Sequence, residues 1–127
     1  MQYEKDMNGE FSDIFKKLES IILSFPNIKV LKNEKQTSYK DEYKTIVMLR
    51  ARTYCHSAFV SSWGQGVKLE KLYPKLIGDG KIVRQLEFTN ISEIDENEIR
   101  EMIKESMILN MEDYELKQLH KQKGKKL

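Results

Sequence analysis

A small set of basic side chains and one tryptophan have the chemistry to hold a ligand in this chain. Arg50 and Arg52 alternate with Leu49 and Ala51, so on a strand both arginines would share one face. Guanidinium groups bind carboxylates and phosphates through paired hydrogen bonds. We therefore expect a basic pocket in which Lys81 steers an anion and Trp63 stacks on a planar ligand, with six lining residues: Arg50, Arg52, His56, Trp63, Lys81 and Arg84. The alternative is a solvated sheet face whose arginines pair with acids of the last predicted helix.

The segment that leads into Arg84 contains two glycines and a lysine, which invites comparison with a phosphate-binding loop. A Walker loop needs Gly-x-x-x-x-Gly-Lys-Ser/Thr between a strand and a helix. Here the spacing between the glycines is shorter, Ile82 replaces the hydroxyl residue, and the residues that follow are typical of a strand. Asp79 and Gly80 both tolerate a positive φ, so we interpret this stretch as a turn.

Arg84 itself interrupts an apolar row. If residues 81–89 form a strand, Ile82, Leu86 and Phe88 share a face with it. Arginine is rarely buried without a partner, which leaves two alternatives. Arg84 either pairs with a carboxylate or reaches solvent at the sheet edge, or it offers its planar fork to an anionic ligand in a cleft.

Cys55 and His56 suggest a nucleophile and its base, but adjacent residues on a strand point to opposite faces and cannot pair with each other. A single cysteine also excludes an intrachain disulfide and a multi-cysteine zinc site. His120 lies near the C-terminal end, so a catalytic triad would have to use His56. An enzyme is therefore our third hypothesis, and the sequence assigns no catalytic residue and no cofactor.

Acidic side chains follow one side of the last predicted helix. Glu98, Glu101 and Glu105 recur at helical spacing, and Asp95 lies at the helix start. Acids in a first turn are favoured by the helix dipole without any metal. A row of carboxylate oxygens is also the ligand type of hard cations, so a metal site on these four residues stays an alternative.

The composition describes one ordinary globular domain. The chain has 127 residues and a formal net charge of +2, which is too small to imply a nucleic-acid partner. No apolar run approaches the length of a membrane span, and no signal-peptide core follows the N-terminus. We expect a cytoplasmic protein with a domain over 1–113 and a basic, flexible tail over 114–127.

The periodicity of apolar residues predicts the elements that would position these side chains. Spacings of three and four over 11–25 predict a helix that ends before Pro26. Four stretches are typical of strands, at 28–32, 45–53, 55–62 and 81–89, and 34–43 is interpreted as a polar loop. Asp95, as N-cap with Glu98 three residues on, starts a last helix. This order predicts an α+β fold, an antiparallel sheet with N- and C-terminal helices packed on one face.

Several stretches of the chain resemble a known family of small proteins. They include Trp63-Gly-Gln-Gly, the segment from Pro74 to Arg84, Leu86-Glu-Phe88 and the helix led by Asp95. Together they resemble the YdhG-like family of small, mostly bacterial proteins, which carry a domain of unknown function. The resemblance is best over 56–113. It implies a curved antiparallel sheet covered by helices, and no activity.

This sequence departs from the family pattern at two places. Gln85 stands where many relatives have a histidine, and the Lys-Trp pair of many members is missing from 27–43. Some relatives are described as frataxin-like iron carriers, so the resemblance implies an iron-handling protein as the second hypothesis. Our first hypothesis is a non-enzymatic module that binds a small anionic ligand or a protein partner. Exposed sheet edges make a homodimer a further expectation.

Overall fold

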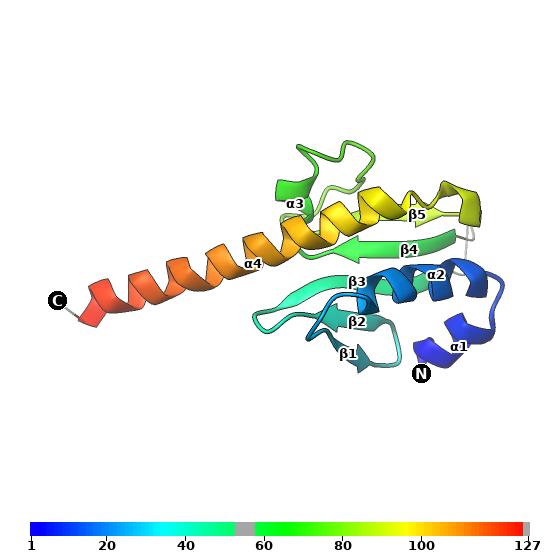
Figure 1. The fold of residues 1–127 in the computed structure, drawn as a ribbon, viewed down its shortest axis with the longest axis horizontal. Helices are drawn as coiled ribbons and strands as arrows, with labels where there is room; N and C mark the ends of the chain where they lie inside the picture. The colour runs from blue at the N-terminus through cyan, green and yellow to red at the C-terminus, as the bar shows by residue number, and fades with distance from the viewer. Residues whose placement is uncertain (53–57, 126–127) are drawn as a thin grey trace.

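The computed structural model describes residues 1–52 and 58–125. Five strands form one antiparallel sheet in which each strand pairs with its neighbours along the chain: β1 (Lys29–Lys32), β2 (Thr37–Lys40), β3 (Thr45–Arg52), β4 (Ala58–Trp63) and β5 (Arg84–Phe88). The helices are α1 (Gln2–Asn8), α2 (Ser12–Leu23), α3 (Gly66–Leu69) and α4 (Glu96–Lys125), with a 3₁₀ turn at Ile91–Glu93. Figure 1 shows α2 and α4 crossing the same face of the sheet, which confirms the α+β prediction.

The core lies between that face and the two long helices. The apolar stripe of α2 is buried against the sheet, as its spacing predicted: Ile14, Phe15, Leu18, Ile21 and Ile22. The start of α4 contributes Ile99, Met102 and Ile103 to the same core. Asp95 caps α4, because its Oδ1 accepts a hydrogen bond from the Glu98 amide at 3.2 Å.

A first helix that the sequence did not predict packs at the edge of this core. The ring of Tyr3 in α1 meets Phe15 of α2 edge-on at 5.4 Å between centroids. The ammonium group of Lys32 in β1 lies 3.7 Å from the centroid of the Tyr3 ring. The backbone amide of Gln2 also donates to the carbonyl of Asn33. These contacts place α1 against the turn between β1 and β2, as Figure 1 shows.

Cross-strand partners define the two faces of the sheet. Trp63 is buried in the core and is the register partner of Arg84, so both lie on the face that the helices cover. Arg50 is the partner of Val60, which is in turn the partner of Glu87. Val60 lies three residues before Trp63 and therefore points to the opposite face. The backbone thus places Arg84 on one face of the sheet and Arg50 on the other.

Two predictions of secondary structure are wrong, one in the type of an element and one in its start. Residues 34–43 were interpreted as a loop, but β2 lies there and its Thr37, Ser38 and Tyr39 are buried. The strand expected over 81–89 begins only at Arg84, because Ile82 belongs to the preceding loop and its side chain is exposed. The predicted strand at 55–62 is described from Ala58 onward, and its first residues lie outside the described ranges.

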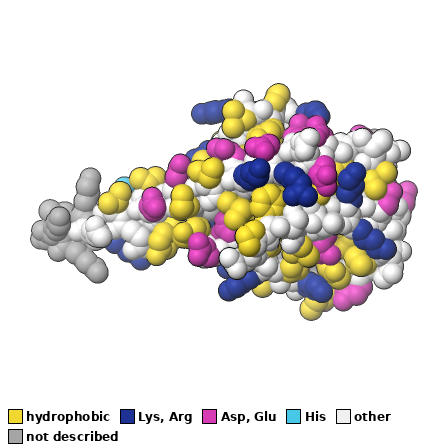
Figure 2. All heavy atoms as spheres, in the orientation of Figure 1, with side chains coloured by type: hydrophobic (Ala, Val, Ile, Leu, Met, Phe, Trp, Pro, Cys, Tyr) yellow, Lys and Arg dark blue, Asp and Glu magenta, His cyan; other side chains and the backbone are white. Residues whose placement is uncertain are grey.

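The segment 114–125, for which the sequence predicted a flexible tail, continues α4 as helix. α4 therefore projects well beyond the sheet (Figure 1). Figure 2 shows hydrophobic side chains along this half of the helix, where five large apolar residues are exposed: Ile108, Met111, Tyr114, Leu116 and Leu119. Within the described residues, no helix has the length and apolar character needed to cross a bilayer.

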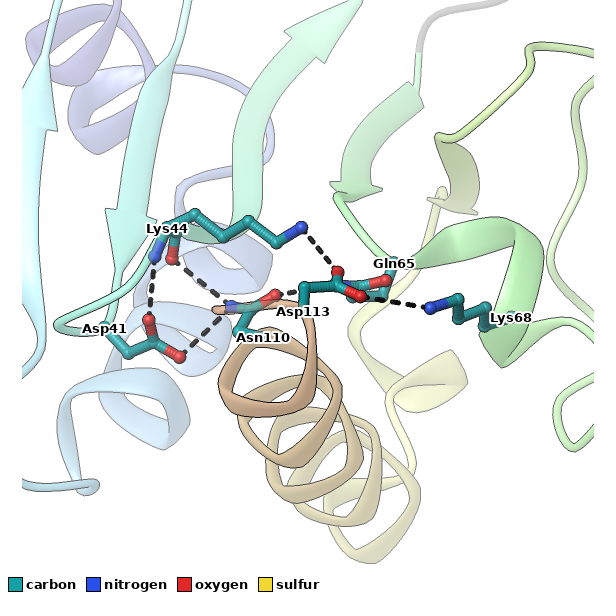
Figure 3. A network of polar contacts seen from close by, with 6 residues as sticks. All are labelled: Asp41, Lys44, Gln65, Lys68, Asn110 and Asp113. Atoms are coloured by element: carbon teal, nitrogen blue, oxygen red, sulfur yellow. Dashed lines mark hydrogen bonds and ion pairs between the residues drawn. The ribbon is translucent and has the colours of Figure 1, made fainter. Parts of the chain in front are cut away.

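A buried polar network attaches α4 to the sheet (Figure 3). Asn110, with 1% of its surface exposed, is at its centre. Its amide group donates to Asp41 Oδ2 at 3.1 Å and to the carbonyl of Lys44 at 3.3 Å, in the turn between β2 and β3. Its Oδ1 accepts from Gln65 Nε2 at 2.8 Å, in the turn between β4 and α3. One side chain thus joins α4 to two separate turns.

Asp113, one turn further along α4, completes the network. Its carboxylate accepts from Gln65 at 2.8 Å, Lys44 Nζ at 2.6 Å and Lys68 Nζ at 3.2 Å. Partial burial raises the pKa of Asp113, but these three hydrogen bonds outweigh it and lower the pKa to about 2. Asp113 is therefore ionised across the physiological range and fixes the point at which α4 leaves the body.

Candidate binding site

A hollow of about 470 Å³ lies between α1, the turn after β1 and the end of β3. Its volume is in the range of small-molecule sites. Its walls are formed by Gln2, Lys5, Asp6, Gly9, Glu10, Phe11, Glu34, Lys35, Arg50, Ala51 and Arg52. Four of these side chains are basic and three are acidic, so the hollow offers both signs of charge to a ligand.

The hollow exists because β3 is longer than its neighbour. β2 starts at Thr37, whose register partner on β3 is Leu49. Ala51 therefore lies past the end of β2, and its amide hydrogen would have no strand partner on that side. Asp6 of α1 supplies the acceptor, since its Oδ1 receives the Ala51 amide at 3.1 Å. α1 is thus held beside the part of β3 that β2 does not reach, and the hollow lies between α1 and β3.

Asp6 is the most deeply buried charged residue of this region, with 2% of its surface exposed. Its Oδ1 also accepts from Gln2 Nε2 at 2.8 Å. Its Oδ2 is buried and has no hydrogen-bond partner among the residues that the structure describes. Burial raises the pKa of Asp6, and the hydrogen bonds from Gln2 and from the Ala51 amide only partly oppose this.

The basic side chains of the hollow differ in how far they are occupied. Arg52 forms an ion pair with Glu87 at 2.8 Å and donates to Gln85 Oε1 at 3.4 Å. Arg50 makes no ion pair and no side-chain hydrogen bond within residues 1–52 and 58–125. Lys5 and Lys35 are exposed at the rim. Among the described residues, Arg50 is therefore the guanidinium of the hollow that a ligand could engage without displacing a protein partner.

Of the five described residues that the sequence grouped in a pocket, the structure brings two together. Arg50 and Arg52 both line the hollow. Trp63 is buried in the core with 1% of its surface exposed, and its Nε1 donates to Ser61 Oγ at 3.1 Å. Lys81 is exposed in the loop before β5. His56 lies outside the described residues.

Arg84 is held by the protein itself. Its Nε forms an ion pair with Glu70 Oε2 at 2.7 Å, and 12% of the arginine side chain is exposed. Its Nη1 donates to the carbonyls of Gly80 and Val83. Of the two alternatives for Arg84, pairing with a carboxylate is therefore the one observed. The acid comes from the residue after α3 and not from the last helix.

The acidic residues proposed as a cation site are also occupied or dispersed. Asp95 caps α4, Glu98 lies 3.8 Å from Lys75, and Glu101 lies 3.4 Å from Lys104. Glu105 is half-buried further along the helix. In the part of the chain that the structure describes, no three His, Cys, Asp or Glu side chains come together as a metal site requires. The arrangement of these residues gives the cation hypothesis no support.

Sequence reasoning missed Asp6, Lys5 and Lys35 as lining residues. A weak signal existed, because Tyr3 and Met7, with spacing four, pack against the core and could have suggested a helix before residue 11. Nothing in the local pattern distinguishes Asp6 from the exposed acids on either side of it. Its burial follows from the long-range contact with β3.

Comparison with known proteins found no matching family model, no matching curated protein and no matching solved structure. The resemblance to the YdhG-like family stays a prediction from the residues of 56–113.

Proposed function

We propose that this chain is a non-enzymatic binding module whose ligand is a small molecule with an acidic group, held in the hollow between α1 and β3. The observation that carries the proposal is Arg50, a half-buried guanidinium that lines the hollow and has no protein partner among the described residues. Lys5 and Lys35 lie at the same rim. An anion would receive paired hydrogen bonds from Arg50 and long-range attraction from the two lysines.

The energetic contribution of Arg50 sets the size of the expected effect. A hydrogen bond to a charged group contributes about 1.5–3 kcal/mol. Loss of the Arg50 guanidinium should therefore weaken binding of an anion by roughly tenfold to a hundredfold. Arg52 should matter less, because the ion pair with Glu87 already occupies it.

The test is a thermal-shift screen of inorganic phosphate and of small mono- and dicarboxylates, followed by calorimetric titration of the best compound. We expect a compound that raises the melting temperature of the wild type, and we expect Arg50→Gln to remove most of the rise. Arg100→Gln is the matched control, because it removes the same charge at the contact of α4 with Ser24 of α2. A screen without any shift, or equal losses in the two variants, would overturn the proposal.

A further inference from the structure

We infer that two copies of this chain pair through α4, so that the end of each helix lies in a groove on the other copy. The groove is at the point where α4 leaves the body, between α4, the residues after α2 and the turn between β2 and β3. It has a volume of about 280 Å³ and shares no described lining residue with the hollow of Arg50. Its apolar lining residues are Pro26, Tyr43, Met107, Ile108 and Met111.

The groove combines accessible apolar side chains with negative charge. Ile108 and Met111 are 46% and 38% exposed. The charged residues of its described lining are both acids, Asp41 and Glu42. Asp41 is buried and bonded to Asn110, whereas Glu42 is exposed and forms no ion pair within residues 1–52 and 58–125. An apolar groove beside an exposed acid fits a helix with apolar and basic side chains.

The end of α4 carries such side chains on the side that faces the groove. Leu119 follows Ile108 by about three turns, and Lys121 follows Met107 by about four turns. Two rows of α4 that line the groove therefore continue into the end of the helix, one with an apolar and one with a basic residue. Leu119 is 55% exposed, and Lys121 is exposed and makes no ion pair in the described part of the chain.

The end of α4 cannot reach the groove of its own chain. α4 is one continuous helix that runs away from the body (Figure 1), and Leu119 lies about 15 Å further along its axis than the groove. A second copy related by a two-fold axis runs antiparallel. It can therefore bring its own Leu119 and Lys121 to the groove and receive the same two residues in return. This contact closes as a dimer and leaves neither groove empty.

The length of the contact sets the expected strength. Residues 107–122 cover about 24 Å of helix. An interface of this length is at the low end of the size range for specific association, so we expect a monomer at about 1 µM and mostly dimer at about 1 mM. Glu115 follows Ile108 by about two turns and lies midway between the groove and the end. The two-fold axis brings the two Glu115 carboxylates near each other, and this repulsion opposes pairing.

The experiment is sedimentation velocity of the full chain at concentrations from about 1 µM to 1 mM, where a weak dimer forms. Leu119→Ser and Lys121→Glu should each raise the dissociation constant roughly tenfold, because each change acts at both contacts of the dimer. Leu72→Ser and Lys71→Glu are the matched controls. Both residues are exposed after α3 and do not line the groove, so these variants should dimerise as the wild type does.

Two further variants test the arrangement of the copies. Glu42→Lys should weaken the dimer as Lys121→Glu does. An equimolar mixture of these two variants should restore it, because each contact of the mixed dimer again joins opposite charges. Glu115→Gln should tighten the dimer several-fold by removing the repulsion at the axis. A gain in association cannot arise from damage to the fold.

A wild-type chain that stays monomeric at about 1 mM would overturn the inference, since even a weak specific contact associates at that concentration. A dimer that the controls weaken as much as Leu119→Ser and Lys121→Glu would overturn it as well. The two-fold arrangement is rejected if the mixture fails to restore the dimer, or if Glu115→Gln dimerises no more tightly than the wild type.

Discussion

Replacing Asn110 by alanine should destabilise the fold far more than its position on an exposed helix suggests. Asn110 is 1% exposed and joins α4 to two turns through three hydrogen bonds, with distances of 2.8, 3.1 and 3.3 Å. A typical hydrogen bond contributes about 1 kcal/mol net to stability, so the loss of all three costs about 3 kcal/mol. The loss of unfolding free energy is not offset by solvation, because Asp41 Oδ2, which accepts from Asn110, would lose that donor in a buried site.

The assay is urea unfolding followed by the fluorescence of Trp63, the single tryptophan, which is buried in the core. Ser106→Ala is the matched control, one turn earlier on the same face of α4. Ser106 is fully buried and its Oγ has no partner in the described part of the chain, so its removal should leave stability unchanged or slightly increased. The reasoning would be refuted if Asn110→Ala stayed within about 0.5 kcal/mol of the wild type, the range of neutral surface changes, or if Ser106→Ala were the more damaging variant.

Three further predictions concern Arg84, two glycines, and the acid at which α4 leaves the sheet. Arg84→Gln should lower the free energy of unfolding by about 1–2 kcal/mol, because it breaks a partly exposed ion pair with Glu70. It should leave the ligand affinity of the hollow unchanged. Thermal melts and titration of the same sample check the two expectations. Gly66→Ala should prevent stable folding, because a Cβ at this position would lie 2.8 Å from the Cα of Arg84. Gly80→Ala is the control. A Cβ there lies 3.5 Å from a single carbonyl oxygen, so this variant should melt near the wild-type temperature. The pKa of Asp113 is lowered from 3.8 to about 2 in the folded protein, so the unfolded chain binds more protons between these two pH values. The free energy of unfolding should therefore fall as the pH drops through this window. Acid unfolding curves of Asp113→Asn should lack this fall.

The long helix and strand with regular apolar spacing could be predicted from sequence, because the spacing of apolar residues shows which face is buried. α2 and β3 carry apolar residues with periods that fit a helix and a strand, and both lie where the sequence placed them. β2 could not be recognised, because the sequence Thr-Ser-Tyr-Lys has a single large apolar group. The burial of β2 depends on residues distant in sequence: the hydroxyl of Tyr39 donates to Glu19 of α2 at 2.5 Å.

Of the residues that line the hollow, only those placed by a local rule could be predicted from the sequence. Alternation along one strand correctly placed Arg50 and Arg52 together. The face of Arg84 relative to Arg50 depends on the register of three strands and on where β5 begins, and neither is encoded in a local pattern. Asp6 could not be found at all, because it is buried where α1 meets the edge of β3 that extends past β2.

The projecting half of α4 has a consequence for how unfolding of this protein is observed. The helix has 30 residues, about 45 Å of length, and beyond Asp113 most of its side chains are exposed. A helical segment with so little packing melts gradually and without a sharp midpoint. Far-ultraviolet circular dichroism should therefore show a sloping loss of signal before the indole emission changes, and the two curves should not superimpose. That mismatch reports fraying of one end of α4 rather than a populated folding intermediate.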